Sequence, residues 1–70
     1  MALTPLQRQI RRLRNEAGLT QEQLATRLRL KDKSTISHWE LGDTSPRGRM
    51  IPKIAKVLGV SVSRLYDEAA

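Results

Sequence analysis

Residues Leu19 to Glu40, which read LTQEQLATRLRLKDKSTISHWE, carry the most informative pattern in the chain. Its first part, Thr20 to Gln23, places a hydroxyl where a helix cap is needed and a Gln three residues later, which is the pattern of a capping box. The apolar residues that follow have the spacing of one helix face: Leu24, Ala25 and Leu28. This pattern predicts a short helix of about nine residues.

A second helix is predicted directly after the first. Asp32 is a favourable N-cap, Lys33 to Leu41 has helical spacing, and Gly42 is a stop signal. Ile36 and Trp39 lie three residues apart and are expected to face inward, with Trp39 anchoring the helix to the core. The turn between the two helices is expected to be roughly four residues long.

The outward face of the second helix is unusual. Its residues are Ser34, Ser37, His38 and Leu41, with Lys33 at the edge. Solvated helix faces ordinarily carry long charged residues with strong helix propensity. Serines there suit a face that approaches another surface closely and exchanges hydrogen bonds with it. The major groove of B-DNA, about 12 Å wide, accepts one such helix.

Further helices are predicted on both sides of this pair. Thr4 to Gln7 carries another capping pattern with Pro at the first helical position, and Gly18 is expected to end that helix. The apolar stripe of this helix is Leu6, Ile10, Leu13 and Ala17. The polar and basic segment Gly42 to Arg49 is predicted to be a loop.

The last third of the chain predicts two more helices. One runs from near Pro52 to Leu58, and its inner face is Ile51, Ile54, Ala55 and Leu58. The other follows Ser61, and its inward residues are expected to be Val62 and Leu65. The expected fold is therefore all-α, with five helices in a single domain over residues 1–70 and a helix-turn-helix unit over residues 20–41.

Composition excludes several classes of protein. The chain has 70 residues, no Cys and one His, which rules out a disulfide scaffold and a Cys-ligated or His-rich metal site. No apolar stretch reaches the roughly 18–20 residues of a membrane span. Residues 1–13 lack the apolar core of a signal peptide, so we expect a cytoplasmic protein. Lys and Arg number 13 against 7 Asp and Glu, and the net charge of +6 favours a polyanionic partner.

The sequence also argues against enzymatic catalysis. The single His, His38, lies among serines with no carboxylate evident beside it, so no Ser-His-Asp arrangement can be assembled. In so short a chain, burial and chain entropy nearly cancel, which leaves little stability for an enclosed pocket. We expect no enzymatic activity, no cofactor and no small-molecule substrate.

Taken in order, these motifs resemble the Xre or lambda-repressor-like (Cro/CI-type) helix-turn-helix family. The matching residues are Leu19 to Glu22, Leu24, Ala25, Leu28, Ser34 to Ser37, Trp39 and Glu40. The stretch from Ile54 to Ser61 resembles the family's fourth helix and its exit. Together with Arg14 and Gly18, the likeness covers nearly the whole chain.

The resemblance implies that the helix over Lys33 to Leu41 lies in the major groove of DNA. The base-reading positions would be Lys33, Ser34, Ser37 and His38. Gln21 would touch a phosphate and brace this helix, and Arg14 would form an ion pair with Glu40. The loop after the helix, which contacts phosphates in the phage-repressor branch, here carries Arg47 and Arg49.

This chain departs from the family in the turn between the two helices. Family members commonly have Gly where this chain has Arg29, and the turn is one residue longer. The extra residue leaves open whether Lys31 or Lys33 lies nearest the bases.

We therefore expect a bacterial or phage transcriptional regulator, of the repressor type, that binds specific sequences of double-stranded DNA. Both a monomer and a homodimer are open, the homodimer using Val62, Leu65 and Tyr66. An antitoxin-type DNA binder that also holds a toxin protein is the alternative, although residues 67–70 are a short remainder for such a contact. A sequence-specific RNA reader would usually show more stacking aromatics than Trp39 and Tyr66.

Overall fold

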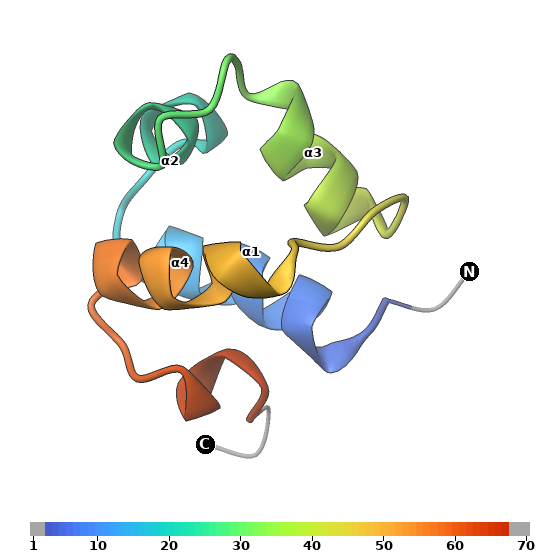
Figure 1. The fold of residues 1–70 in the computed structure, drawn as a ribbon, viewed down its shortest axis with the longest axis vertical. Coiled ribbons are helices and arrows are strands. Elements are labelled where there is room, and N and C mark those ends of the chain that lie inside the picture. The colour runs from blue at the N-terminus through green and yellow to red at the C-terminus, as the bar shows by residue number, and fades with distance from the viewer. Residues whose placement is uncertain (1–2, 68–70) are drawn as a thin grey trace.

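The computed structural model describes residues 3–67, whose regular structure is helical (Figure 1). The α-helices are α1 (Pro5–Glu16), α2 (Gln21–Arg27), α3 (Ser34–Leu41) and α4 (Ile51–Leu58). Single 3-10 turns, η1 (Gly48–Met50) and η2 (Ser63–Leu65), precede and follow α4. Residues 3–67 contain no strand, which confirms the all-α class.

Both predicted capping boxes form. Thr4 pairs with Gln7 before α1, and Thr20 pairs with Gln23 before α2; each Thr hydroxyl accepts from the Gln N–H, and each Gln side chain accepts from the Thr N–H. The apolar stripe of α1 is buried except at its last member, Ala17. The prediction that Ala17 faces inward is wrong, because α1 has already ended at Glu16 and Ala17 is its exposed C-cap.

All four α-helices end with the same pair of backbone hydrogen bonds. A residue in the left-handed region donates its N–H to the carbonyl three residues back, and the next N–H reaches the carbonyl five residues back, as in a Schellman motif. The left-handed residues are Gly18, Arg29, Gly42 and Gly59. Because Arg29, at φ 58°, ends α2, this helix has seven residues and is shorter than predicted.

The start of α3 lies one residue later than expected, at Ser34, although Lys33 already has helical dihedrals (φ −75°, ψ −10°). The N-cap is therefore Lys33, and Asp32, which was predicted there, lies one residue earlier; its Oδ1 still accepts hydrogen bonds from the Ser34 N–H, at 2.8 Å, and from the Ser34 hydroxyl. Both hydrogen bonds stabilise the carboxylate and therefore hold the pKa of Asp32 below its ordinary value. The bond from the Ser34 hydroxyl has the larger effect.

The segment between α3 and α4 is a loop only in part. Gly48 to Met50 forms η1, so Arg49, which was expected in the loop, belongs to a 3-10 turn. This turn runs directly into α4, which begins at Ile51, one residue before the expected start. Pro52 lies in the first turn of α4, as predicted.

The expected fifth helix is the single 3-10 turn η2. Serine and valine before it are mediocre helix formers. The carbonyls of Arg64 and Asp67 accept hydrogen bonds from the amide of Gln9, at 2.9 and 2.7 Å, instead of from a further helical turn. Leu65 is buried, as predicted, but Val62, which was expected to face inward, is exposed.

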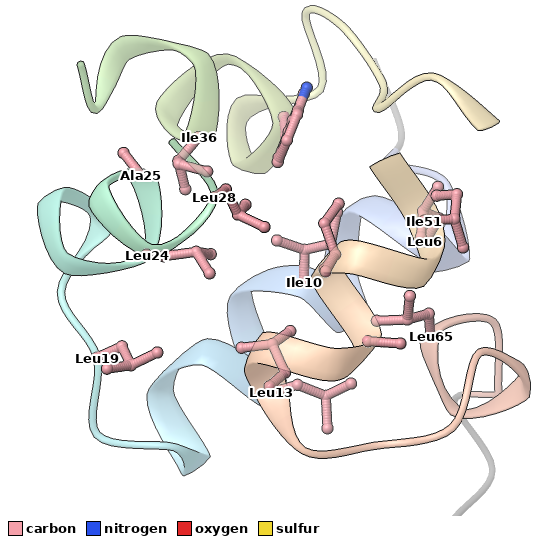
Figure 2. Close-up of a cluster of buried hydrophobic side chains, with 14 residues drawn as sticks. Leu6, Ile10, Leu13, Leu19, Leu24, Ala25, Leu28, Ile36, Ile51 and Leu65 are labelled. Atoms are coloured by element: carbon pink, nitrogen blue, oxygen red, sulfur yellow. The ribbon is translucent and has the colours of Figure 1, made fainter. Parts of the chain in front are cut away.

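Apolar side chains from all four α-helices and from η2 meet in one core (Figure 2). Ile36 of α3 is fully buried and Trp39 is 4% exposed, so the sole Trp anchors α3 as predicted. α3 contacts both α1 and α2. This packing turns the opposite face of α3 toward solvent.

Candidate nucleic-acid interface

The face of α3 that lies opposite the core carries the side chains predicted there. Ser34 and His38 are exposed, and Ser37 is half-buried. Lys33, directly before α3, and Lys31, in the preceding turn, are both exposed. Because serine side chains are short, another surface can come close to the backbone of α3 along this face.

The orientation of α3 depends on Glu40, a buried carboxylate in its last turn. Arg14 of α1 holds it with two bonds, from Nε to Oε2 at 2.7 Å and from Nη2 to Oε1 at 3.0 Å. Gln21, the first residue of α2, donates from Nε2 to the same Oε1 at 3.1 Å. The Arg14–Glu40 pair is the one that the family resemblance implied, and this one group joins α1, α2 and α3.

The partners of this carboxylate are themselves well satisfied. Nη1 of Arg14 donates to the carbonyl of Leu19 at 2.7 Å. Hydrogen bonds to Glu40 raise the pKa of Arg14, and burial offsets part of that effect. The amide of Gln21 has two N–H donors, of which Glu40 takes one. The half-buried Gln21 side chain therefore keeps one N–H donor beyond its bond to Glu40.

His38 has a carboxylate partner that was not expected from the sequence. Its Nδ1 lies 3.1 Å from Oδ2 of Asp43, and both side chains are about half exposed. The left-handed turn at Gly42, φ 89°, brings Asp43 back over the last turn of α3, where its N–H donates to the His38 carbonyl. Asp43 therefore occupies Nδ1 of His38, and among the described residues no side chain hydrogen-bonds to Nε2.

Arg47, in the loop, and Arg49, in η1, are exposed, and in the described part of the chain neither has an ion-pair partner. Space around Gly48 between them is open. The start of the loop is fixed: the amide of Gln7 donates to the Thr44 carbonyl at 2.8 Å. The sequence identified Gln7 as a capping residue only, and no local signal pointed to this bond.

Cationic side chains thus lie beyond both ends of α3. Lys31 and Lys33 precede the helix, and Arg47 and Arg49 follow it along the chain. Figure 1 shows the yellow loop leaving the C-terminal end of α3, opposite the turn that enters it. Hydroxyl and imidazole groups lie between these cations on one exposed helix face.

Two further features are absent from residues 3–67. No group of three or more His, Cys, Asp or Glu side chains in this range could hold a metal ion. No helix in the same range is long and apolar enough to cross a membrane.

Known proteins are similar to this chain in sequence and fold. The family model HTH_3, described as helix-turn-helix, matches residues 10–65. The restriction-modification controller protein C.AhdI from Aeromonas hydrophila is 31% identical, with 89% of this chain and 92% of that chain covered and a TM-score of 0.79. Comparison with curated protein sequences gives no significant match.

Longer proteins contain the same fold. The clp gene regulator ClgR from Corynebacterium glutamicum is 24% identical, with 87% of this chain and 64% of that chain covered and a TM-score of 0.80. FeII HppE in complex with substrate is 26% identical, with 99% of this chain but only 40% of that chain covered and a TM-score of 0.83. With the family model matched over most of its length, the chain belongs to the Xre/Cro-CI-like helix-turn-helix family of DNA-binding transcription regulators.

Proposed function

We propose that this protein is a repressor-type regulator that binds specific sequences of double-stranded DNA, with α3 in the major groove. The observation that supports this most is the solvent-facing side of α3, where short polar side chains lie between two groups of exposed cations. The Glu40 network holds that side in a fixed orientation. A DNA partner implies action in the cytoplasm, and neither a cofactor nor catalysis is required.

Within this proposal the residues divide by role. Those that read base edges are Lys33, Ser34, Ser37 and His38. Those that contact phosphates are Gln21, Lys31, Arg47 and Arg49. Phosphate contacts position the protein and release counterions, whereas contacts with base edges carry the specificity.

We also propose that two copies bind adjacent half-sites on one side of the duplex, about 34 Å apart. The support comes from Val62 and Tyr66 beside η2, which are 43% and 51% exposed. Leu65 was expected to join this contact. It is fully buried in the core and cannot.

The decisive experiment selects bound duplexes from a random pool with the unaltered protein and with two variants. Lys33→Ala is expected to relax preference at one base position by about 1–3 kcal/mol. Arg47→Ala is expected to weaken all duplexes alike and to make the slope of log K against log salt shallower by about 0.9. The matched control is Lys53→Ala, which removes an exposed lysine from α4 and should change neither quantity.

Two outcomes would contradict the proposal. One is tighter binding of duplex RNA or of single strands than of duplex DNA in direct competition. The other is equal loss of base preference in Lys33→Ala and Lys53→Ala, because that would mean that α3 does not read the bases.

A further inference from the structure

Gln7, in the first turn of α1, links the N-terminal end of the domain to the loop after α3. Its side chain is 4% exposed and uses both ends of the amide. Oε1 accepts from the Thr4 N–H at 2.9 Å. Nε2 donates to the Thr44 carbonyl at 2.8 Å and to Oγ of Ser45 at 3.2 Å. The two partners in the loop lie 37 and 38 residues further along the chain.

A second capping box in the same molecule shows that helix capping does not require these loop bonds. Gln23 makes the equivalent bonds with Thr20, but its side chain is exposed. Among residues 3–67 the amide nitrogen of Gln23 has no hydrogen-bond partner. Burial of Gln7 and its two long-range bonds therefore serve something other than the cap.

The loop is held at the positions that lead into its arginines. Thr44 and Ser45 are followed by Pro46, whose ring restricts the backbone of Ser45 to extended conformations. Arg47 comes next, at φ −72° and ψ 155°. Only two residues therefore separate the tethered Thr44 carbonyl from Arg47.

The same N-terminal segment also abuts the start of the loop. An ordinary Cβ at Gly42 would lie 2.7 Å from Cδ2 of Leu3 and 3.8 Å from Oε1 of Gln7. Contacts from Leu3 and Gln7 thus reach the loop both at Gly42 and at Thr44.

We propose that Gln7 is a positioning residue for the DNA interface, which holds the loop so that Arg47 and Arg49 face the phosphates. This inference rests on the phosphate role proposed for those two arginines. The tether fixes the Thr44–Ser45 backbone before DNA arrives, so less chain entropy is lost on binding. Without it, the loop must order as the complex forms, and fewer phosphates are neutralised.

The test compares Gln7→Met with Gln9→Met. Gln9 is also in α1, is 1% exposed, and donates two hydrogen bonds to the C-terminal segment instead of to the loop. The probe is a labelled duplex of scrambled sequence, because phosphate contacts do not depend on base sequence. Gln7→Met is expected to weaken binding about three- to tenfold and to make the salt slope shallower by about 0.9 for each phosphate that the loop no longer neutralises.

Gln9→Met should lower the melting temperature as much as Gln7→Met does and leave the salt slope unchanged, since a purely structural loss does not alter the number of phosphates that the protein neutralises. Ser45→Ala removes one of the two loop partners at an exposed position and leaves the buried Gln7 in place, so it should shift the slope in the same direction even if Gln7→Met folds poorly. Equal slopes for the Gln7 and Gln9 variants would overturn the inference.

A double-mutant cycle separates this inference from the proposed function. If Gln7 acts through the arginines, Gln7→Met should have no further effect on affinity in a protein that also carries Arg47→Ala and Arg49→Ala. An additive loss would overturn the role of Gln7 and leave the arginine contacts intact. If Arg47→Ala with Arg49→Ala does not weaken binding at all, the phosphate role of the loop is wrong, and the role of Gln7 falls with it.

Discussion

At the scale of single residues, Glu40 shows how a small core keeps a charge. A buried carboxylate is costly unless it is paired and its oxygens accept hydrogen bonds. Arg14 and Gln21 together supply three donors to Glu40, from two other helices. Because these donors come from α1 and α2, the carboxylate fixes how α3 lies relative to both.

We predict that Glu40→Gln lowers the free energy of unfolding by about 3 kcal/mol, because it leaves the Arg14 guanidinium buried without a counter-charge. Urea denaturation followed by Trp39 fluorescence measures this change. Glu16→Gln is the control: Glu16 pairs with Arg12 at 3.0 Å, but both side chains are about half exposed.

The control variant should lose less than about 1 kcal/mol, since exposed ion pairs contribute little. Equal losses in Glu40→Gln and Glu16→Gln would show that burial of the Arg14–Glu40 pair does not matter for stability.

At the scale of elements, comparison of the four helix ends shows that the left-handed backbone at Arg29 lowers the stability of the fold. Gly18, Gly42 and Gly59 adopt the left-handed conformation without a Cβ, whereas Arg29 adopts it with one. This conformation is unfavourable for L-residues by roughly 1–2 kcal/mol. The family's usual Gly at this position thus has a physical reason, and this chain departs from it at a measurable cost.

Arg29→Gly is predicted to stabilise the protein by about 0.5–1 kcal/mol, since relief of the left-handed backbone outweighs the greater chain entropy of glycine. Arg27→Gly makes the same chemical change inside α2 and should destabilise by up to about 1 kcal/mol. Thermal melting of both variants gives the signs directly. A loss of stability in Arg29→Gly would refute this account of the turn.

The helices also show which structural features can be predicted from residues that are close in sequence. Both capping boxes and the stops at Gly18 and Gly42 were predicted, because each depends on residues within one turn of one another. The fifth helix was predicted wrongly. The prediction rested on apolar spacing alone. It could not include Gln9, which lies 55 and 58 residues earlier in the chain and donates hydrogen bonds to the carbonyls of Arg64 and Asp67.

At the scale of the whole molecule, the proposed pairing of two copies depends on apolar side chains left on the surface. Val62 and Tyr66 are large apolar side chains left exposed near the C-terminal end of the described residues. Leu41, at the end of α3, is 68% exposed and offers a comparison elsewhere on the surface.

We predict that the protein with both Val62→Ser and Tyr66→Ser sediments as a monomer at concentrations where the unaltered protein is a dimer. On a duplex with two half-sites it should lose cooperative binding and keep its affinity for one half-site. Leu41→Ser should leave association without DNA unchanged. Dimers that persist in the double variant, or dissociate in Leu41→Ser, would place the contact elsewhere.

Local sequence patterns predicted that α1 to α4 form, which face of each is apolar, and which side chains the outer face of α3 carries. Caps, left-handed stops and helical periodicity act over a few residues, so they can be seen in the chain. Packing between distant segments set the pairing of Gln7 with the Thr44 carbonyl and of Gln9 with the carbonyls of Arg64 and Asp67. An amide or carboxylate can pair in many directions, and packing of the whole chain selects the partner.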